Sequence, residues 1–366
     1  MNGHRATKLA VIRLGCRIRG QQGGFSLIEL MISITLGLLI MTGVLALYLD
    51  LSRSNAELAK MNRQIENGRF TLQLLQQELW RAGFWDTYMP PLPSITPPTA
   101  IPNPCTAFSA WDAAYIANLY AIPVQGYAAG TALPAECPAS IEENRQPSSD
   151  VLIVRYAATC AAGAANCEKY NEEKIYLQTQ GCVDTAKYVA SAAIAPVLGR
   201  PLGTAVYKKD CTTPADKRKL IVSIFYIRNF SVAGDGIPTL MRADFDLSSE
   251  SNCPPDWLPC VTMQSAQPVI EGIQSIKFEY GQDTNEDGTA DIFNDCSLCT
   301  ALNWANVVAV RMHVLARNLE ASSGYVNNKT YQLGSTTLGP FNDGFMRHVY
   351  TSYVHLVNPA GRREKP

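Results

Sequence analysis

The most prominent hydrophobic feature is an unbroken run of uncharged, mostly apolar residues from Leu30 to Leu49. About 20 residues at roughly 1.5 Å each match a hydrocarbon core about 30 Å thick, so the run predicts a transmembrane helix. Glu29 lies directly before the run. An ionisable group at this depth costs on the order of 2.5 kcal/mol or more and is usually present to meet a partner charge.

The helical pattern continues beyond this run as one stripe of apolar positions, while charged residues occupy the other faces. Gly83, Pro90 and Pro91 predict the stop. We therefore expect one helix from Phe25 to Ala82, with a transmembrane first half and an amphipathic second half that packs on a globular head. The stripe consists of Leu51, Leu58, Met61, Ile65, Leu72, Leu75 and Leu79. Three glycines of this helix either mark bends or close contacts or are merely tolerated: Gly37, Gly43 and Gly68.

The rest of the chain predicts a β-rich head. Residues 87–147 are rich in proline, alanine and aromatic residues and predict an irregular loop. Six later segments predict strands: Val151–Tyr156, Lys174–Gln178, Lys219–Arg228, Ile273–Tyr280, Asn306–Arg317 and Met346–Val357. The clearest alternation is in the fifth of them, with one face formed by Val308, Val310, Met312, Val314 and Ala316 and the other by Arg311, His313 and Arg317. A mainly antiparallel sheet beside a long helix is an α+β fold.

Composition and charge limit the classes of partner that this chain is expected to bind. An apolar fraction of 47% among 366 residues supports a real core in one large or two ordinary domains. The formal net charge is −1, but residues 1–24 contain five basic residues and no acidic one. Without this segment, 26 basic residues face 32 acidic ones, a balance of −6. Because phosphate binding needs clustered Lys and Arg, this balance argues against nucleic acid as the main partner.

The basic segment 1–24 lacks the small-residue cleavage site that follows the apolar core of a secretory signal. It ends in the run Gly24-Phe25-Ser26-Leu27-Ile28-Glu29. This junction resembles the class III leader junction of type IV prepilins. The resemblance implies that a membrane peptidase cuts after Gly24 and methylates the new terminus at Phe25. It also implies that Glu29 neutralises the terminal amine of a neighbouring subunit. The plainer alternative is an uncleaved signal anchor.

A second resemblance covers the C-terminal third of the chain. It is carried by Ile270-Glu271-Gly272-Ile273, Phe278-Glu279-Tyr280-Gly281, Asp283-x-Asn285-x-Asp287-Gly288 and the strand Val307 to Arg317. These runs are similar to the PilW group of minor pilins. The resemblance implies a type IV pilin-like fold. It also implies prepilin peptidase, other minor pilins, the major pilin and a tip adhesin as partners.

These features divide the chain into three parts. Residues 1–24 form a leader that is removed, residues 25–86 form the long helix with its transmembrane segment at 25–49, and residues 87–366 form a periplasmic, disulfide-containing head. The hypothesis is a minor pilin of the initiating or tip complex of a type IV pilus. It is held in the inner membrane before assembly and lies in the pilus fibre or at its tip afterwards. A minor pseudopilin of type II secretion is the nearest alternative.

Ten of the eleven cysteines follow the leader, an even number that fits up to five disulfides formed in an oxidising periplasm. Three close pairs are the local candidates: Cys160 with Cys167, Cys253 with Cys260, and Cys296 with Cys299. The other four would close longer loops: Cys105, Cys137, Cys182 and Cys211. Cys296-x-x-Cys299 is also the spacing of a thiol redox site or half a zinc site. A local disulfide is favoured because no second such pair and no βαβ context accompany it.

The run from Asp283 to Asp291 has the spacing of an EF-hand-like calcium loop. Oxygen side chains at alternate positions wrap a hard cation, and a glycine permits the turn between them. The predicted Ca²⁺ ligands are Asp283, Asn285, Asp287, the Thr289 carbonyl and Asp291. The twelfth position is Asn294 rather than Glu, so the bidentate ligand is missing and weak affinity is expected. The alternative to a calcium site is a polar hairpin turn that binds nothing. If the loop does bind calcium, a further hypothesis for the function is a calcium-dependent adhesive module.

Catalytic motifs are missing from the sequence, which contains no nucleophile elbow, no P-loop and no His-Glu-x-x-His motif. The histidines after the leader number three: His313, His348 and His355. His313 lies on an otherwise apolar strand and is expected to be structural rather than a ligand or base. We therefore expect a protein that is not an enzyme, against the alternative of a membrane-anchored periplasmic enzyme.

Overall fold

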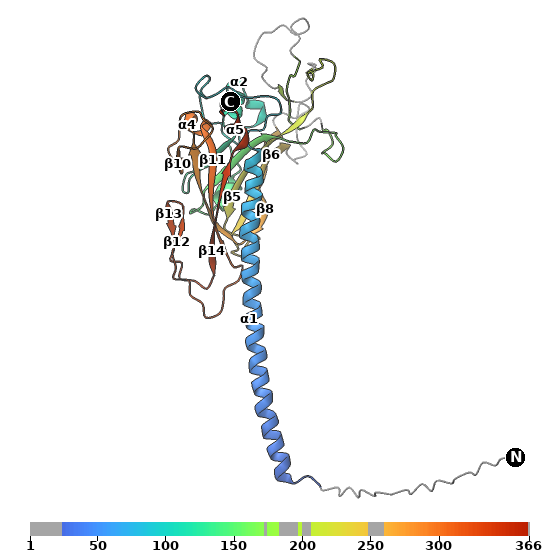
Figure 1. Cartoon of the computed structure of the whole chain (residues 1–366), viewed down its shortest axis with the longest axis vertical. Coiled ribbons are helices and arrows are strands. Elements are labelled where there is room, and N and C mark those ends of the chain that lie inside the picture. Colours follow the sequence, from blue (N-terminus) through green and yellow to red (C-terminus); the bar gives the residue numbers. More distant parts are fainter. Residues whose placement is uncertain (1–23, 172–173, 183–196, 200–205, 248–259, 365–366) are drawn as a thin grey trace, which may run out of the picture. The chain divides into compact units, whose positions relative to one another are not determined.

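The computed structural model describes residues 24–171, 174–182, 197–199, 206–247 and 260–364. The chain divides into two compact units, Met1–Ala56 and Glu57–Pro366, which are described separately. The helix α1 (Leu27–Arg81) contributes residues to both (Figure 1). Its bounds confirm the helix predicted from Phe25 to Ala82. Of the predicted leader, all but Gly24 lies outside the described residues.

In the first unit, α1 exposes its apolar side chains, from Leu27 at 77% to Leu49 at 54%. Three of its hydroxyl groups, those of Ser33, Thr35 and Thr42, donate to carbonyls of the preceding turn, as where Ser33 Oγ donates to the Glu29 carbonyl at 2.7 Å. Within the described part of the chain, α1 alone is long and apolar enough to cross a membrane. A helix that is apolar on all sides needs lipid or other helices around it, which supports the predicted transmembrane half.

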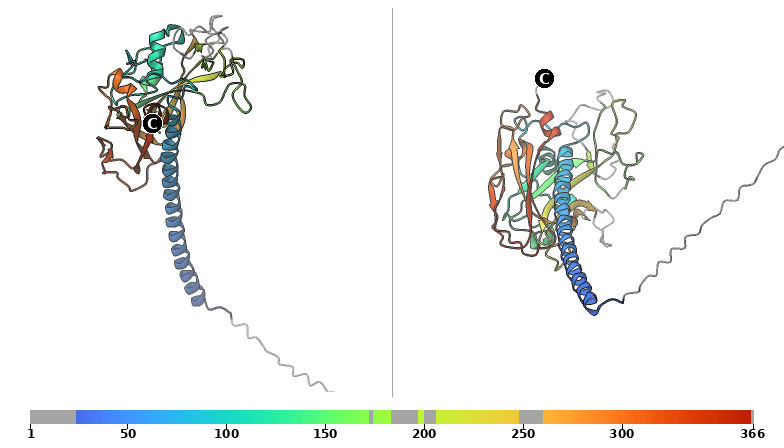
Figure 2. Two further views of the ribbon diagram at one scale, coloured as in Figure 1. Left: turned by 45° about the horizontal axis from the view of Figure 1, so that its top comes forward. Right: turned by 60° about the horizontal axis from the view of Figure 1, so that its bottom comes forward.

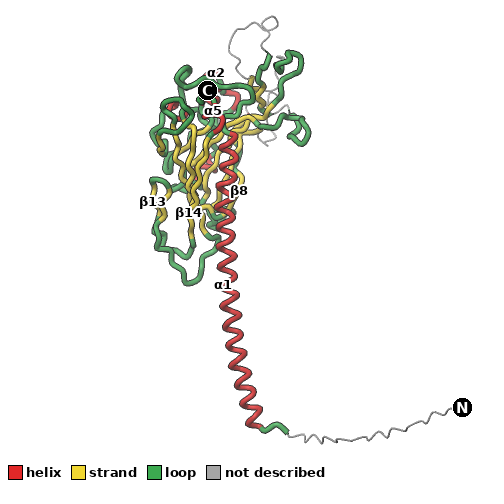
Figure 3. The backbone as a smooth tube through the Cα atoms, in the orientation of Figure 1, coloured by secondary structure: helices red, strands yellow, loops and turns green. Residues whose placement is uncertain are grey.

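The second unit contains an eight-stranded antiparallel sheet with the strand order β1-β2-β5-β3-β4, in which β6 pairs with β5 and also carries β7 and β8. Figure 3 shows the strands of the head in yellow beside the C-terminal part of α1. The strands are β1 (Val124–Tyr127), β2 (Val151–Ala157), β3 (Tyr176–Gln178), β4 (Val197–Gly199), β5 (Arg218–Arg228), β6 (Thr239–Leu247), β7 (Val261–Met263) and β8 (Gln267–Glu271).

A second antiparallel sheet has the order β10-β9-β11-β14, and β12 and β13 form a separate hairpin. Its strands are β9 (Ile273–Gln282), β10 (Ile292–Asn294), β11 (Val307–Arg317) and β14 (Arg347–His355), while the hairpin is β12 (Tyr331–Leu333) and β13 (Thr336–Leu338). The short helices are η1 (Phe108–Ala110), α2 (Ala113–Ala121), α3 (Ala139–Glu143), α4 (Ala301–Ala305) and α5 (Val357–Gly361). A long helix with antiparallel sheets confirms the α+β class.

Two hydrophobic clusters form the core. The first joins α1 to both sheets and includes Leu75, Leu79 and Met312, while the second lies beneath α2 and includes Leu119 and Ile153. Strand β2 is buried at every position, because alternate side chains enter the first and the second cluster. The two views of Figure 2 show the C-terminal half of α1 running beside the strands of the head.

The buried face of α1 differs in part from the predicted apolar stripe. Leu75 and Leu79 are fully buried, as predicted. The prediction that this stripe is buried was wrong for its N-terminal part, because Leu51, Leu58 and Met61 are 63%, 53% and 42% exposed. The stripe therefore meets the head only over the last turns of the helix, from Ile65 onward.

Polar side chains complete the buried face of α1. Gln64 Nε2 donates to the carbonyls of Ala316 and Met346 at 2.9 and 3.1 Å, and the Tyr156 hydroxyl donates to Glu78 at 2.7 Å. Buried polar groups are tolerated when they are hydrogen-bonded. A search for apolar periodicity does not find them, because their partners are strands far along the chain.

Gly68 is a close-contact position. A Cβ atom at this residue would lie 2.3 Å from Cε2 of Tyr350 on β14, whereas one at Gly37 or Gly43 would have no neighbour within 4 Å. Of the two readings open for these glycines, the structure assigns close contact to Gly68 alone.

The five longer predicted strands are confirmed as β2, β5, β9, β11 and β14, and Lys174–Gln178 contracts to β3. The irregular loop predicted for residues 87–147 was wrong in part, because it contains α2, β1 and α3. The Asp112 side chain caps α2 by accepting the Tyr115 N–H at 2.7 Å. Helices this short carry too few periodic positions to be recognised among prolines.

Candidate functional site

The predicted processing junction lies at the start of α1. Phe25 is 86% exposed. Ser26 Oγ accepts the Ile28 N–H at 3.3 Å, and Glu29 Oε2 accepts the Ser26 N–H at 3.3 Å. This pair is a variant of the capping box: the Glu three residues after the Ser bonds back to the Ser amide, but the Ser oxygen accepts the amide two residues on rather than three.

This geometry gives the Glu29 carboxylate a local role and a direction. It points back along the chain toward Phe25, at the helix end where the macrodipole favours negative charge. The sequence interpretation did not single out Ser26, although Ser-x-x-Glu before an apolar run is the known signature of a capping box. The processing roles of Gly24, Phe25 and Glu29 stay predictions.

The predicted calcium loop folds around the side chain of Asp283, which is fully buried. Its Oδ1 accepts the N–H groups of Glu286 and Asp287 at 2.6 and 3.3 Å, and its Oδ2 accepts that of Gly288 at 2.9 Å. Gly288 has a φ of +85°, which favours glycine. A Cβ atom at this position would lie 3.1 Å from the carbonyl oxygen of Ala360 in α5. The glycine thus permits both the turn and the approach of α5.

A positive charge from the C-terminal segment meets the same carboxylate. Arg363 Nη1 lies 3.4 Å from Asp283 Oδ2, and both side chains are fully buried. Arg363 Nη2 donates to the Ala305 carbonyl at 2.7 Å and to Asn306 Oδ1 at 3.0 Å. Burial lowers the pKa of Arg363, and the charge of Asp283 opposes this effect. The loop therefore binds an internal guanidinium at its first predicted ligand.

Three other predicted ligands, Asn285, Asp287 and Asp291, also accept hydrogen bonds within the loop. Asp287 Oδ1 accepts the Thr289 N–H at 2.8 Å, and Asp291 Oδ2 accepts the Thr284 N–H at 2.7 Å. Asn285 Oδ1 accepts the Asp287 N–H at 3.0 Å. No group of three or more His, Cys, Asp or Glu in the described ranges is arranged to hold a metal ion. In this conformation these side-chain oxygens accept hydrogen bonds from the loop's own amides, and calcium binding stays a prediction.

Four disulfides are present among the described residues. Cys160–Cys167 and Cys296–Cys299 confirm two of the predicted local pairs. The cysteines expected to close longer loops pair as Cys105–Cys137 and Cys182–Cys211. Cys253 lies outside the described residues, so its pairing with Cys260 stays a prediction. The Cys-x-x-Cys motif is a disulfide, and Gln282 Nε2 contacts both of its sulfur atoms, at 3.4 and 3.3 Å.

The histidines are not gathered into one site. His313 on β11 is buried, with Nδ1 3.1 Å from Thr351 Oγ1 and Nε2 3.4 Å from Glu279 Oε2. His348 and His355 lie on β14, one near each end of its pairing with β11. His313 thus joins β11 to both of its neighbouring strands, an arrangement that supports the structural role predicted for it.

Comparisons with known proteins match two separate parts of the chain. Residues 19–45 match the prokaryotic N-terminal methylation motif, and residues 224–358 match the family described as type IV pilus-assembly protein W, PilW. The chain also aligns with a type IV-like pilin from Thermus thermophilus at 13% identity, covering 81% of this chain and 96% of that one, with a TM-score of 0.35. No curated protein matches the chain significantly.

The two matched segments are those that carried the sequence resemblances. The first contains the junction around Gly24 and Glu29, and the second contains the loop from Asp283 to Asp291 and β11. Residues 46–223 belong to neither segment.

Proposed function

We propose, from the premise that this chain is a PilW-like minor pilin of the type IV pilus, that it acts in the initiating or tip complex of the fibre. In this proposal, prepilin peptidase removes residues 1–24 and methylates Phe25. The subunit waits in the inner membrane with its head in the periplasm, and enters the fibre with other minor pilins, the major pilin and a tip adhesin. Its contribution is assembly, without catalysis.

The observation that carries the proposal is the Glu29 carboxylate at the first turn of an exposed apolar helix. Glu29 Oε2 is bonded at 3.3 Å to the Ser26 amide, one residue beyond the predicted new terminus. A carboxylate in apolar surroundings needs a charged partner. The methylated amine of Phe25 on a neighbouring, staggered subunit supplies such a charge and would fix the axial register between the two helices.

The exposed apolar surface of α1 needs apolar surroundings both before and after assembly. Leu38, Leu39 and Ile40 are more than half exposed, and so are most of their apolar neighbours. Lipid covers such a surface before assembly, and the helices of neighbouring subunits cover it in the fibre. The exchange costs little apolar burial, so pairing at Glu29 decides whether a subunit is accepted.

Two measurements on the same cells test this mechanism. The full-length Glu29→Gln variant is expressed in a piliated host that has an active prepilin peptidase. Mass spectrometry of its N-terminus reports cleavage and methylation, and the amount in sheared fibres reports incorporation. We expect a normal terminus at methylated Phe25 but a loss from fibres of about tenfold or more, since an unpaired charge in the apolar core costs more than about 1.4 kcal/mol.

Glu66→Gln is the matched control, because Glu66 is an exposed acid of the same helix within the second unit. It should enter fibres as the wild type does. Equal incorporation of Glu29→Gln would contradict the pairing role, and a wild-type chain that still begins at Met1 would contradict processing. For the tip, the copies of this chain per fibre are counted against fibre length. A tip component stays constant per fibre, whereas copies that rise with length would contradict the tip role.

A further inference from the structure

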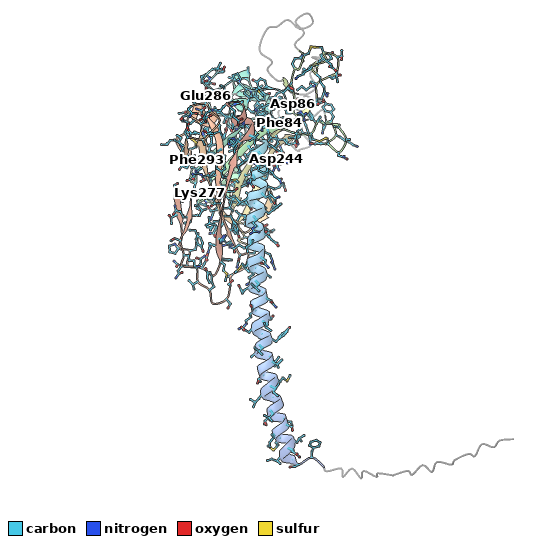
Figure 4. The ribbon with its side chains drawn as sticks, in the orientation of Figure 1. Phe84, Asp86, Asp244, Lys277, Glu286 and Phe293 are labelled. Carbon is cyan, nitrogen blue, oxygen red and sulfur yellow. A yellow bond between two sulfur atoms is a disulfide. The ribbon has the colours of Figure 1, made fainter. Side chains whose placement is uncertain are left out.

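A cavity of about 200 Å³ lies in the second unit where α1 ends and α5 packs beside it. Figure 4 labels Phe84 and Asp86, two of its lining residues, just past the end of α1. Aromatic side chains form much of its wall: Phe84, Trp85, Tyr88 and Tyr120. Trp85 and Tyr120 are buried and pack edge to face at 5.0 Å between ring centroids. The cavity is thus a pocket with largely aromatic walls.

Arg362 lines this pocket with an unsatisfied guanidinium. Its Nε and Nη2 atoms are inaccessible to solvent and have no hydrogen-bond acceptor in the part of the chain that the structure describes. These two nitrogens form one edge of the guanidinium, the edge that binds a carboxylate through two parallel hydrogen bonds. Burial lowers the pKa of Arg362 to about 10, with the nearby charge of Arg363 adding to the effect, so the group is charged at neutral pH.

The obvious internal acceptors are already used. Asp86, the acid that lines the pocket, lies 3.1 Å from Arg218 Nε and accepts the Thr179 hydroxyl at 2.9 Å. At the end of α1, the Ala82 carbonyl accepts Asn358 Nδ2 at 3.1 Å. These two acceptors near the pocket are therefore engaged by other donors.

A second donor in the same pocket also lacks an acceptor. The Tyr120 hydroxyl is buried and has no hydrogen-bond partner within the described ranges. Burial raises its pKa, so the hydroxyl keeps its proton and remains a donor. Unsatisfied buried groups are rare in native proteins and commonly mark the place of an ion, a water or a ligand. Two such donors on residues that line one cavity favour an occupant that accepts hydrogen bonds, and the charge of Arg362 favours an anion.

We propose that this pocket binds a carboxylate carried on a small apolar stem, with the charged Arg362 guanidinium as its partner and the aromatic walls around its stem. Because Nε and Nη2 are inaccessible in this conformation, the guanidinium has to turn toward the cavity to donate to the carboxylate. The carboxylate belongs either to a free organic acid or to an acidic side chain of another protein chain. Because the walls are aromatic, the pocket favours such a group over inorganic phosphate, which has no apolar surface to bury.

The test uses the full chain in detergent micelles and isothermal titration with three probes. Phenylacetate represents a free acid, N-acetyl-glutamate amide represents an acidic side chain within a peptide, and sodium phosphate represents an inorganic anion. We expect at least one carboxylate probe to bind. Arg362→Gln should weaken that binding by about tenfold to a hundredfold, because a charge-assisted bidentate pair is lost, and Arg362→Lys should restore part of it.

Arg63→Gln is the matched control, since Arg63 is an exposed arginine of α1 in the same unit, and it should bind as the wild type does. Thermal unfolding without ligand checks that Arg362→Gln is folded, because this change removes an unpaired buried charge and should not lower the transition temperature. Binding of phenylacetate alone identifies a free acid, and binding of the glutamate probe identifies a protein side chain. No binding by either, equal binding by Arg362→Gln, or tighter binding of phosphate would overturn the proposal.

Discussion

Arg362 and Arg363 are consecutive residues, yet their guanidinium groups differ in the acceptors that the described part of the chain offers them. Arg363 Nη2 donates to the Ala305 carbonyl at 2.7 Å and Nη1 lies 3.4 Å from Asp283, while Nε and Nη2 of Arg362 have no acceptor in the described chain. Both residues follow α5, which ends at Gly361. The end of that helix therefore places one arginine in the loop around Asp283 and the other in the aromatic pocket.

This difference predicts opposite effects on stability. Arg363→Gln removes the partner of a fully buried carboxylate, and breaking a buried pair in this way typically costs about 3–5 kcal/mol. Denaturant unfolding of the full chain in micelles at pH 7 should show a loss of about 3 kcal/mol. Arg362→Gln is the control and should leave the free energy of unfolding equal or higher. Similar losses in the two variants would contradict the contrast between them.

The pair of Arg363 and Asp283 also leads to a prediction about calcium binding. Arg363 provides the positive charge at Asp283, the first expected ligand of the EF-hand-like loop, so a calcium ion must displace it. We expect Arg363→Gln to bind calcium about tenfold more tightly than the wild type, by titration well below both unfolding temperatures. Arg363→Gln with Asp287→Ala should lose this gain, because Asp287 is another expected ligand. Equal calcium affinities of the wild type and Arg363→Gln would mean that the guanidinium does not compete with the ion.

A third prediction concerns acid and the pair of Asp343 with Arg347. Arg347 Nη1 and Nη2 donate to the two oxygens of Asp343 at 2.6 Å each, and these bonds hold the pKa of Asp343 below its ordinary value of 3.8. A carboxyl whose folded pKa is depressed stabilises the fold above its unfolded pKa. This contribution is lost as the pH falls through the folded pKa.

Asp343→Asn should therefore cost about 1 kcal/mol at pH 7, a modest value because the Asp343 side chain is 32% exposed. The cost should shrink as the pH falls below about 4, where the carboxyl of the unfolded chain is protonated first and the folded carboxyl follows at its lower pKa. Denaturant unfolding at pH 7, 5, 4 and 3 measures it. Glu143→Gln, at an exposed acid on α3, is the control. A cost that stays constant across this range would show that the ionised form contributes nothing.

The predictability of each element followed its length and its partners. The helix α1 and strands such as β11 were predicted because their periodic apolar positions extend over many residues. Short elements such as α2 carry too few periodic positions, and β6 was not predicted although apolar and polar residues alternate along part of it. The buried polar residues of α1 were not predicted, for another reason. Gln64 is buried because strand carbonyls far along the chain accept its amide, and no local pattern reports such partners.

The candidate sites followed the same principle. The residues of the processing junction are neighbours in the sequence, so they could be predicted from it. The role of Ser26 was not predicted, although the Ser-x-x-Glu pattern indicates it. The loop from Asp283 has the spacing of a calcium site, but Arg363, far along the chain, supplies the charge that its carboxylate meets. The pocket of Arg362 combines residues from the end of α1, α2 and the C-terminal segment, and no motif links them.

The last prediction tests how closely α1 packs on β14. A Cβ atom at Gly68 would lie 2.3 Å from the Tyr350 ring, so Gly68→Ala must displace that ring or the helix. Because the contact is with the far end of a side chain, we expect a loss of about 1–2 kcal/mol in the free energy of unfolding. Tyr350→Leu combined with Gly68→Ala should recover most of this loss, since leucine leaves room for the new methyl group, and Tyr350→Leu alone sets the baseline. Gly43→Ala, at a site with no neighbour within 4 Å, should leave the unfolding of the head unchanged. A loss at Gly68 that the double variant does not recover would place the strain in the helix itself.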